Sequence, residues 1–226
     1  MIQSRYVIFN GRSLPENEAA LGISDLSIVR GYGIFDYLKT VRHRPLFLED
    51  NLDRFFNSAK LMDLPIAYSR EELKGQIYNL MALNNIPDSG IKLLLTGGYS
   101  TDGYTIATPN LILTQNPLTR NLAQETNGLR LLLFPYHRAF PLVKSIDYVM
   151  GIQALKEAKS KGADDVLYVS NGIVTECPRA NFFLVTADNK LLTPGDNVLA
   201  GITRKQIIGL LGTEYAIEIS AVTVED

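Results

Sequence analysis

The spacing of apolar residues changes repeatedly along this chain, and that change constrains the fold more than any other feature. Short apolar or alternating runs, typical of β-strands, occupy 6–9, 33–41, 91–95, 111–114, 129–134, 166–169, 181–185, 190–193 and 215–219. Apolar residues instead recur at three- and four-residue steps over 48–64, after 69, over 148–161 and after 203, as on amphipathic helices. Strands and helices are mixed without strict alternation, so we expect an α+β (mixed α/β) fold rather than a doubly wound parallel sheet.

Local signals predict where several of these elements begin and end. Asn10-Gly11 follows the first strand and is typical of a tight hairpin turn. Pro65 ends the first long helix, and the S-x-x-E pattern of Ser69 and Glu72 predicts a capping box that opens the next one.

The polar segment 116–128 holds Pro117, shows no consistent period and separates two predicted α/β halves. We therefore predict an N-terminal α/β domain at 1–115, an interdomain connection at 116–128 and a C-terminal domain at 129–226.

Composition excludes several classes of function. The chain has 226 residues, 46% of them hydrophobic and 20% charged, and a net charge of −2 without a long basic run, so nucleic acid is not an expected partner. Its apolar runs are too short to cross a membrane. The single cysteine, Cys177, cannot form an intramolecular disulfide, which favours a cytoplasmic location. No metal site is expected.

Lys144 follows an apolar loop in the segment FPLVKS. Most lysines are surface residues, but apolar neighbours lower the pKa of an amine by desolvation, and a Schiff-base lysine needs this. Lys144 is therefore a candidate catalytic residue.

Glu176 comes directly after a predicted strand and its turn, close to Asn181. A glutamate there commonly caps a turn or faces water. A fixed carboxylate could also keep a pyridine nitrogen protonated, and the Asn181 amide could hold the loop in shape.

Gly201-Ile202-Thr203-Arg204 precedes a helical pattern, and Arg54 lies at the edge of an apolar helical stripe. The free N–H groups of a helix start bind phosphate, although an ordinary threonine cap is the alternative. An arginine at the margin of a core suits bidentate phosphate contact, although a solvated arginine is the commoner case. Together, these groups favour pyridoxal phosphate chemistry.

The order of these motifs resembles the class IV (fold-type IV) pyridoxal-phosphate enzymes, which include branched-chain aminotransferases, D-amino acid aminotransferases and 4-amino-4-deoxychorismate lyases. The matching segments are RGYGIFDYLKT (30–40), EDNLDRFFNSAKLM (49–62), KSIDY (144–148), VTECPRANFFLV (174–185) and LAGITRKQII (199–208).

The resemblance implies a role for each of these residues. Lys144 would form the internal aldimine and shuttle protons, and Glu176 would face the pyridine nitrogen. The other cofactor-binding candidates are Arg54, Tyr148, Asn181, Gly201, Ile202 and Thr203. The family also implies two α/β domains of the D-amino acid aminotransferase-like type with the cofactor between them, and a homodimer whose active sites share residues.

Two departures from the family pattern bear on function. The family continues for several tens of residues past the last residues of this sequence, so the C-terminal domain is expected to be incomplete. On the substrate side, Lys39 replaces the usual arginine and Asp36-Tyr37 replace Glu-Gly. The candidate substrate-binding residues are Phe35, Lys39, His137 and Arg138.

The sequence therefore predicts pyridoxal-phosphate-dependent transamination between a small amino acid, branched-chain amino acids included, and a 2-oxo acid. The alternatives are elimination of pyruvate by an aminodeoxychorismate lyase, and a non-catalytic, truncated relative that keeps the fold.

Overall fold

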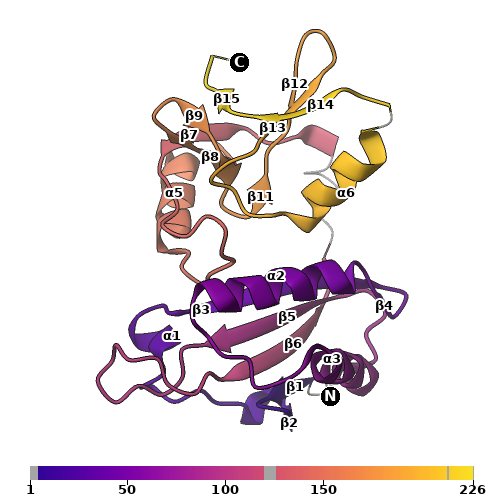
Figure 1. The fold of residues 1–226 in the computed structure, drawn as a ribbon, viewed down its shortest axis with the longest axis vertical. Coiled ribbons are helices and arrows are strands. Elements are labelled where there is room, and N and C mark those ends of the chain that lie inside the picture. The colour runs from indigo at the N-terminus through magenta and orange to yellow at the C-terminus, as the bar shows by residue number, and fades with distance from the viewer. Residues whose placement is uncertain (1–4, 120–125, 213, 226) are drawn as a thin grey trace. The chain divides into compact units, whose positions relative to one another are not determined.

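The computed structural model describes residues 5–119, 126–212 and 214–225. The chain divides into two compact units, Met1–Arg120 with Val143–Asp147, and Asn121–Leu142 with Tyr148–Asp226 (Figure 1). Of the predicted connection at 116–128, residues 120–125 lie outside the described part of the chain.

Within the described residues, the first unit contains one antiparallel sheet of six strands in the order β2-β1-β6-β5-β3-β4. Asn10 and Gly11 join the first two strands with φ of 49° and 78°, which confirms the predicted hairpin turn. The strands are β1 (Tyr6–Phe9), β2 (Arg12–Pro15), β3 (Gly33–Val41), β4 (Arg44–Pro45), β5 (Ser89–Thr96) and β6 (Leu111–Pro117).

Two long helices pack on this sheet, α2 (Leu48–Leu61) on β3 and α3 (Arg70–Asn84) on β1 and β6 (Figure 1). Their apolar stripes and the inward side chains of the strands form one core in which Phe55, Leu73 and Ile91 are fully buried. Each such side chain stabilises the unit by about 1.5–3 kcal/mol. A short helix α1 (Leu26–Val29) and a 3₁₀ turn η1 (Glu16–Glu18) precede β3.

The boundaries of α2 and α3 follow the local signals with one shift. Ser69 and Glu72 form the predicted capping box at the start of α3. The first long helix ends at Leu61 rather than at 64, because Met62 is its C-cap and Asp63 has a φ of 51°, which a right-handed helix cannot contain.

Residues 143–147 pack with the first unit, whereas the predicted division placed them in the C-terminal domain. Val143 is buried in the first unit's core, and Ser145 forms an antiparallel bridge with Ile34. A segment distant in sequence is thus held against β3 by tertiary contacts, which no local pattern could reveal.

The second unit, over its described residues, contains a four-stranded sheet in the order β15-β9-β8-β7, a three-stranded sheet β12-β13-β14 and the small hairpin β10-β11. The parallel strands β7 and β8 are joined through α5. The elements are β7 (Leu131–Pro135), α5 (Val149–Ser160), β8 (Asp165–Ser170), β9 (Ile173–Val174), β10 (Glu176–Cys177), β11 (Ala180–Asn181), β12 (Leu184–Val185), β13 (Leu191–Pro194), α6 (Ile202–Leu211), β14 (Ile217–Ser220) and β15 (Val222–Thr223).

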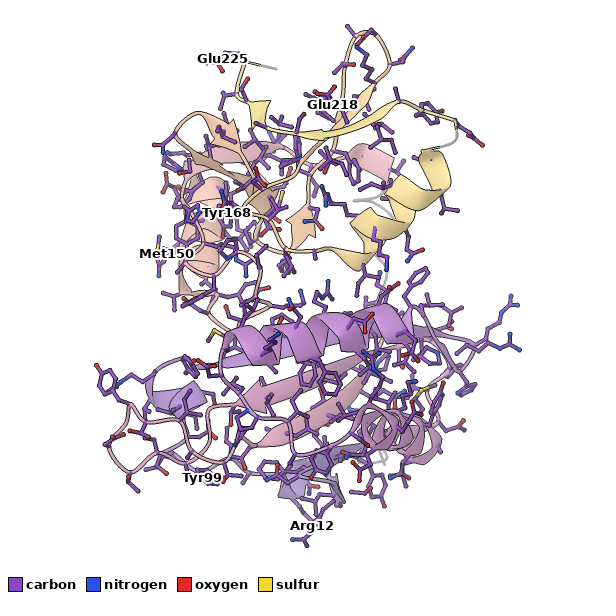
Figure 2. The ribbon with its side chains drawn as sticks, in the orientation of Figure 1. Arg12, Tyr99, Met150, Tyr168, Glu218 and Glu225 are labelled. Atoms are coloured by element: carbon purple, nitrogen blue, oxygen red, sulfur yellow. The ribbon has the colours of Figure 1, made fainter. Side chains whose placement is uncertain are left out.

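Strand β8 is buried on both faces. Val166 and Tyr168 (the latter labelled in Figure 2) pack with Ala154 and Ala158 of α5. Leu167 packs with a second cluster around Val174. Alternate side chains of a strand point to opposite faces, so β8 supports both layers of this unit.

Two predicted elements of the second unit differ from the structure. The expected strand 181–185 is divided, because Asn181 pairs with Glu176 in the β10-β11 hairpin and Leu184 pairs with Leu192 of β13. Helix α6 begins at Ile202 with Gly201 as its N-cap, so Thr203 lies in the first turn and is not the cap.

Candidate active site

Lys144 is held at the start of β3 by main-chain hydrogen bonds. Its carbonyl oxygen accepts from the backbone N–H of Phe35 at 2.9 Å, and its own N–H donates to Oγ of Ser58 on α2 at 3.2 Å. The N–H of Ile146 donates to the carbonyl oxygen of Gly33 at 3.1 Å. The main chain of Lys144 is therefore held in place by hydrogen bonds to both β3 and α2.

The amine of Lys144 lies against an aromatic ring. Its Nζ is 4.7 Å from the centroid of the Phe35 ring, and Nζ of Lys92 approaches the same ring at 5.6 Å. Tyr37 and Lys39 follow Phe35 on the same face of β3 and are exposed. This face of the first unit therefore presents an aromatic ring flanked by cationic side chains.

Arg54 of α2 forms a buried bidentate ion pair with Asp36 of β3. Its Nε and Nη2 each lie 2.8 Å from a carboxylate oxygen, and the two side chains are 10% and 0% exposed. The Arg54 guanidinium is thus desolvated and is oriented by an acid that the sequence motifs did not indicate as a site residue. The signal for Asp36 was its place on the inward face of an alternating strand.

Glu176 is buried, and several donors hold its carboxylate. Oε1 accepts from Nη1 of Arg138 at 2.8 Å, and Oε2 accepts from the backbone N–H of Leu199 and from Nδ2 of Asn181, both at 3.1 Å. The acid is 4% exposed. Charge-assisted hydrogen bonds of this kind fix an acid in one orientation.

Arg138 and His137 follow β7. Arg138 is engaged by Glu176 and also donates to the carbonyl oxygen of Pro141 at 3.2 Å. His137 is exposed. Of these two sequence candidates for a substrate carboxylate, Arg138 already holds the buried acid.

Tyr148 precedes α5 as its N-cap, near Gly151 and the buried Tyr168. Burial raises the pKa of Tyr168 to about 12, and the neighbouring Tyr136 ring stacks edge-on at 4.9 Å. The Tyr168 hydroxyl therefore stays protonated at neutral pH.

Helix α6 starts without a side-chain cap from the described residues. Arg204 in its first turn donates from Nε to Oγ1 of Thr193 at 2.9 Å and from Nη2 to the carbonyl oxygen of Pro194 at 2.8 Å. Burial lowers the pKa of this guanidinium. Arg204 therefore anchors the helix start to β13, and Thr203 stays exposed beside the first-turn N–H groups.

The chemistry of these groups fits a phosphorylated pyridine aldehyde. An uncapped helix start suits the phosphate, a buried carboxylate suits a protonated ring nitrogen, and a lysine amine suits the aldehyde. The described residues contain no cluster of side chains that could hold a metal ion. No helix among them has the length and apolar character needed to cross a membrane.

The sequence model of the family Amino-transferase class IV matches residues 33–226. A putative branched-chain-amino-acid aminotransferase of Methanocaldococcus jannaschii is 26% identical over 94% of this chain and 76% of its own length. The D-alanine aminotransferase of Bacillus licheniformis is 24% identical over 97% of this chain and 80% of its own length.

Solved structures show the same fold. The pyridoxal-phosphate-bound form of a hypothetical aminotransferase from Mycobacterium tuberculosis superposes with a TM-score of 0.86 at 24% identity, over 98% of this chain and 83% of that one. A match of the family model over most of the chain, together with this fold, confirms the resemblance seen in the motifs. The chain belongs to the class IV aminotransferases, the pyridoxal-phosphate-dependent enzymes of fold type IV.

Proposed function

We propose that this chain transfers an amino group between a small amino acid and a 2-oxo acid, and that Nζ of Lys144 forms the covalent bond to pyridoxal phosphate. The observation that carries the proposal is the buried carboxylate of Glu176, held by Arg138, Asn181 and Leu199. An acid so fixed can hold a proton on a pyridine nitrogen. Bound pyridoxal phosphate supplies an electron-withdrawing ring that makes the substrate Cα–H acidic.

Each residue has a separate role in this proposal. Lys144 moves the proton between the substrate Cα and C4′ of the cofactor, from a backbone that Phe35 and Ser58 keep in place. The first-turn N–H groups of α6, at Ile202 and Thr203, and the guanidinium of Arg54 bind the phosphate. Tyr148 would contribute to holding the cofactor.

The substrate side is proposed to include Phe35 and Lys39. Phe35 is in contact with the Lys144 amine, and Lys39 extends from the same face of β3. Lys92, which also lies against the Phe35 ring, adds a cation that sequence reasoning missed. Arg138 is better suited to hold Glu176 than to receive a substrate carboxylate, which leaves His137 as the other sequence candidate.

The relatives include proteins named for branched-chain amino acids and for D-alanine, so both are candidate substrate classes for this chain. A homodimer and a cytoplasmic location also remain proposals, which rest on the family and on the single cysteine respectively.

The first experiment is a visible absorption spectrum of the purified protein with pyridoxal phosphate, before and after borohydride. We expect a yellow band that borohydride removes, with the reduced label on the Lys144 peptide. Lys144→Ala should lose the label, whereas Lys92→Ala, a matched lysine at the same Phe35 ring, should keep it. A label on another peptide would overturn the assignment of Lys144.

A second measurement separates transamination from elimination. An amino donor given alone should convert the bound cofactor to its aminated form and release one equivalent of 2-oxo acid. Release of pyruvate without any accumulation of aminated cofactor would contradict transamination.

A further inference from the structure

Gly201 is a glycine for which the backbone gives no reason. Its φ of −69° and ψ of 128° lie in the extended region that any residue adopts. A Cβ at this position would nevertheless lie 1.6 Å from Oδ1 and 2.8 Å from Cγ of Asn181. The next neighbour, Cβ of Arg204, is at an ordinary 3.4 Å. The side chain of Asn181 alone therefore demands glycine at the N-cap of α6.

Asn181 is also tied to the buried acid. It is the cross-strand partner of Glu176 in the β10-β11 hairpin, and its Nδ2 donates to Oε2 of Glu176 at 3.1 Å. The same nitrogen donates to the carbonyl oxygen of Leu199 at 3.0 Å, while the Leu199 N–H donates to Glu176 at 3.1 Å. One amide thus joins the acid to Leu199, which lies two residues before the α6 N-cap.

An amide is the side chain that suits this place. Its NH₂ group has two donors for two acceptors, the Glu176 carboxylate and the Leu199 carbonyl. An aspartate would set a second carboxylate against Glu176, and an alanine would leave the Leu199 carbonyl without this donor.

We propose that Asn181 is a positioning residue that fixes the start of α6 relative to Glu176, and that Gly201 makes room for it. The inference rests on the proposed function, in which Glu176 holds the ring nitrogen of the cofactor and the α6 start holds its phosphate. Both ends of one rigid molecule must be bound at once, so the separation of these two protein groups determines how much the phosphate adds to affinity.

The test measures the dissociation constants of pyridoxal phosphate and of pyridoxal, which lacks the phosphate, by absorbance titration of the full chain. The variants are Asn181→Ala, Gly201→Ala and the double variant. Gly209→Ala is the matched control, because this glycine lies in the same helix and a Cβ there meets nothing within 4 Å. The thermal midpoint of each cofactor-free variant is recorded as an independent readout.

Gly201→Ala should weaken pyridoxal phosphate binding about tenfold or more, but less than about twofold when Asn181 is already alanine, since the clash is then gone. Asn181→Ala should reduce the ratio of the two dissociation constants, the part of affinity that the phosphate adds. Gly209→Ala should change neither the dissociation constant of pyridoxal phosphate nor its ratio to that of pyridoxal. The thermal midpoints should show the same relief in the double variant, so recovery of a poorly folding Gly201→Ala by Asn181→Ala also supports the clash.

An equal loss of both ligands in Asn181→Ala would mean that the residue only supports the fold, and would overturn the inference. The inference would also be overturned if Gly201→Ala weakened pyridoxal phosphate binding equally in the unmodified chain and in Asn181→Ala. If the unmodified chain binds neither ligand, the proposed function itself fails, and this inference fails with it.

Discussion

The buried pair of Arg54 and Asp36 permits a quantitative prediction for Arg54→Met in the cofactor-free protein. The Asp36 carboxylate is fully buried and accepts from Nε and Nη2 of Arg54, both at 2.8 Å. Methionine keeps most of the packing volume but leaves a buried charge without its partner. Breaking such a pair costs about 3–5 kcal/mol, a large part of the stability of a domain.

The surface offers a control pair that uses the same two guanidinium nitrogens, Nε and Nη2. Arg5 contacts Glu16 through Nε at 3.0 Å and Nη2 at 2.9 Å, but these side chains are 40% and 43% exposed. Arg5→Met should therefore cost no more than about 1 kcal/mol. The two variants therefore compare a buried ion pair with an exposed one, in which both nitrogens contact the single oxygen Oε2 of Glu16.

The chain has no tryptophan, so far-UV circular dichroism in urea is the primary assay. Native-state hydrogen exchange of the β3 amides then reports on the first unit itself. At about 2–4 °C per kcal/mol, Arg54→Met should lower the thermal midpoint by about 6–20 °C. Asp36→Asn in the same background should recover part of the loss, since it removes the unpaired charge.

Equal costs for Arg54→Met and Arg5→Met would refute the reasoning. That result would mean that the Asp36 carboxylate is satisfied without the guanidinium, for example by the backbone N–H of Tyr37, which donates to it at 2.7 Å.

Three further predictions concern single residues. Lys144→Ala should reduce transamination by about 10²–10⁴-fold or more, because the proton shuttle is lost, measured as 2-oxo acid released. Burial raises the pKa of Asp25, but the hydrogen bonds it accepts, first from Ser27, hold that pKa below its ordinary 3.8. Asp25 therefore stabilises the fold above about pH 4 and loses this contribution as the pH falls. The free energy of unfolding of the unmodified chain should exceed that of Asp25→Asn at pH 6, and this difference should become smaller below pH 4. Urea unfolding of both proteins at pH 3 to 6 measures it. Burial raises the pKa of the Cys177 thiol to about 11 from 9.0. Iodoacetamide at pH 8 should then modify it about a hundredfold more slowly in the folded than in the unfolded chain, and equal rates would contradict this.

Local patterns predicted much of the fold. The residue range 33–41 was expected as a strand and is β3, and the Ser69–Glu72 capping box opens α3 as expected. These predictions succeeded because period, turn chemistry and capping depend on neighbours within a few residues. The division of 181–185 was missed, since pairing of Asn181 with Glu176 and of Leu184 with Leu192 is decided between strands.

The candidate site, too, was predicted only as far as local motifs allow. Motif order was enough to indicate Lys144, Glu176 and the turn before α6, and the match to the class IV aminotransferase family confirms the resemblance on which they rest. Their individual roles stay predictions. Nothing local indicated that Arg138 pairs with Glu176, 38 residues away, because such a contact depends on how the strands and loops pack.

By itself, the sequence determined the mixed strand and helix composition, the family and the chemical types available at the site. The tertiary structure decided which groups meet. It attached the Lys144 segment to β3 of the first unit, paired Arg54 with Asp36 and placed Asn181 against Gly201. The physical reason is the distance along the sequence over which each effect acts. Helix and strand propensities and helix caps depend on residues within a turn or two, whereas ion pairs and steric exclusion act between segments that only folding brings together.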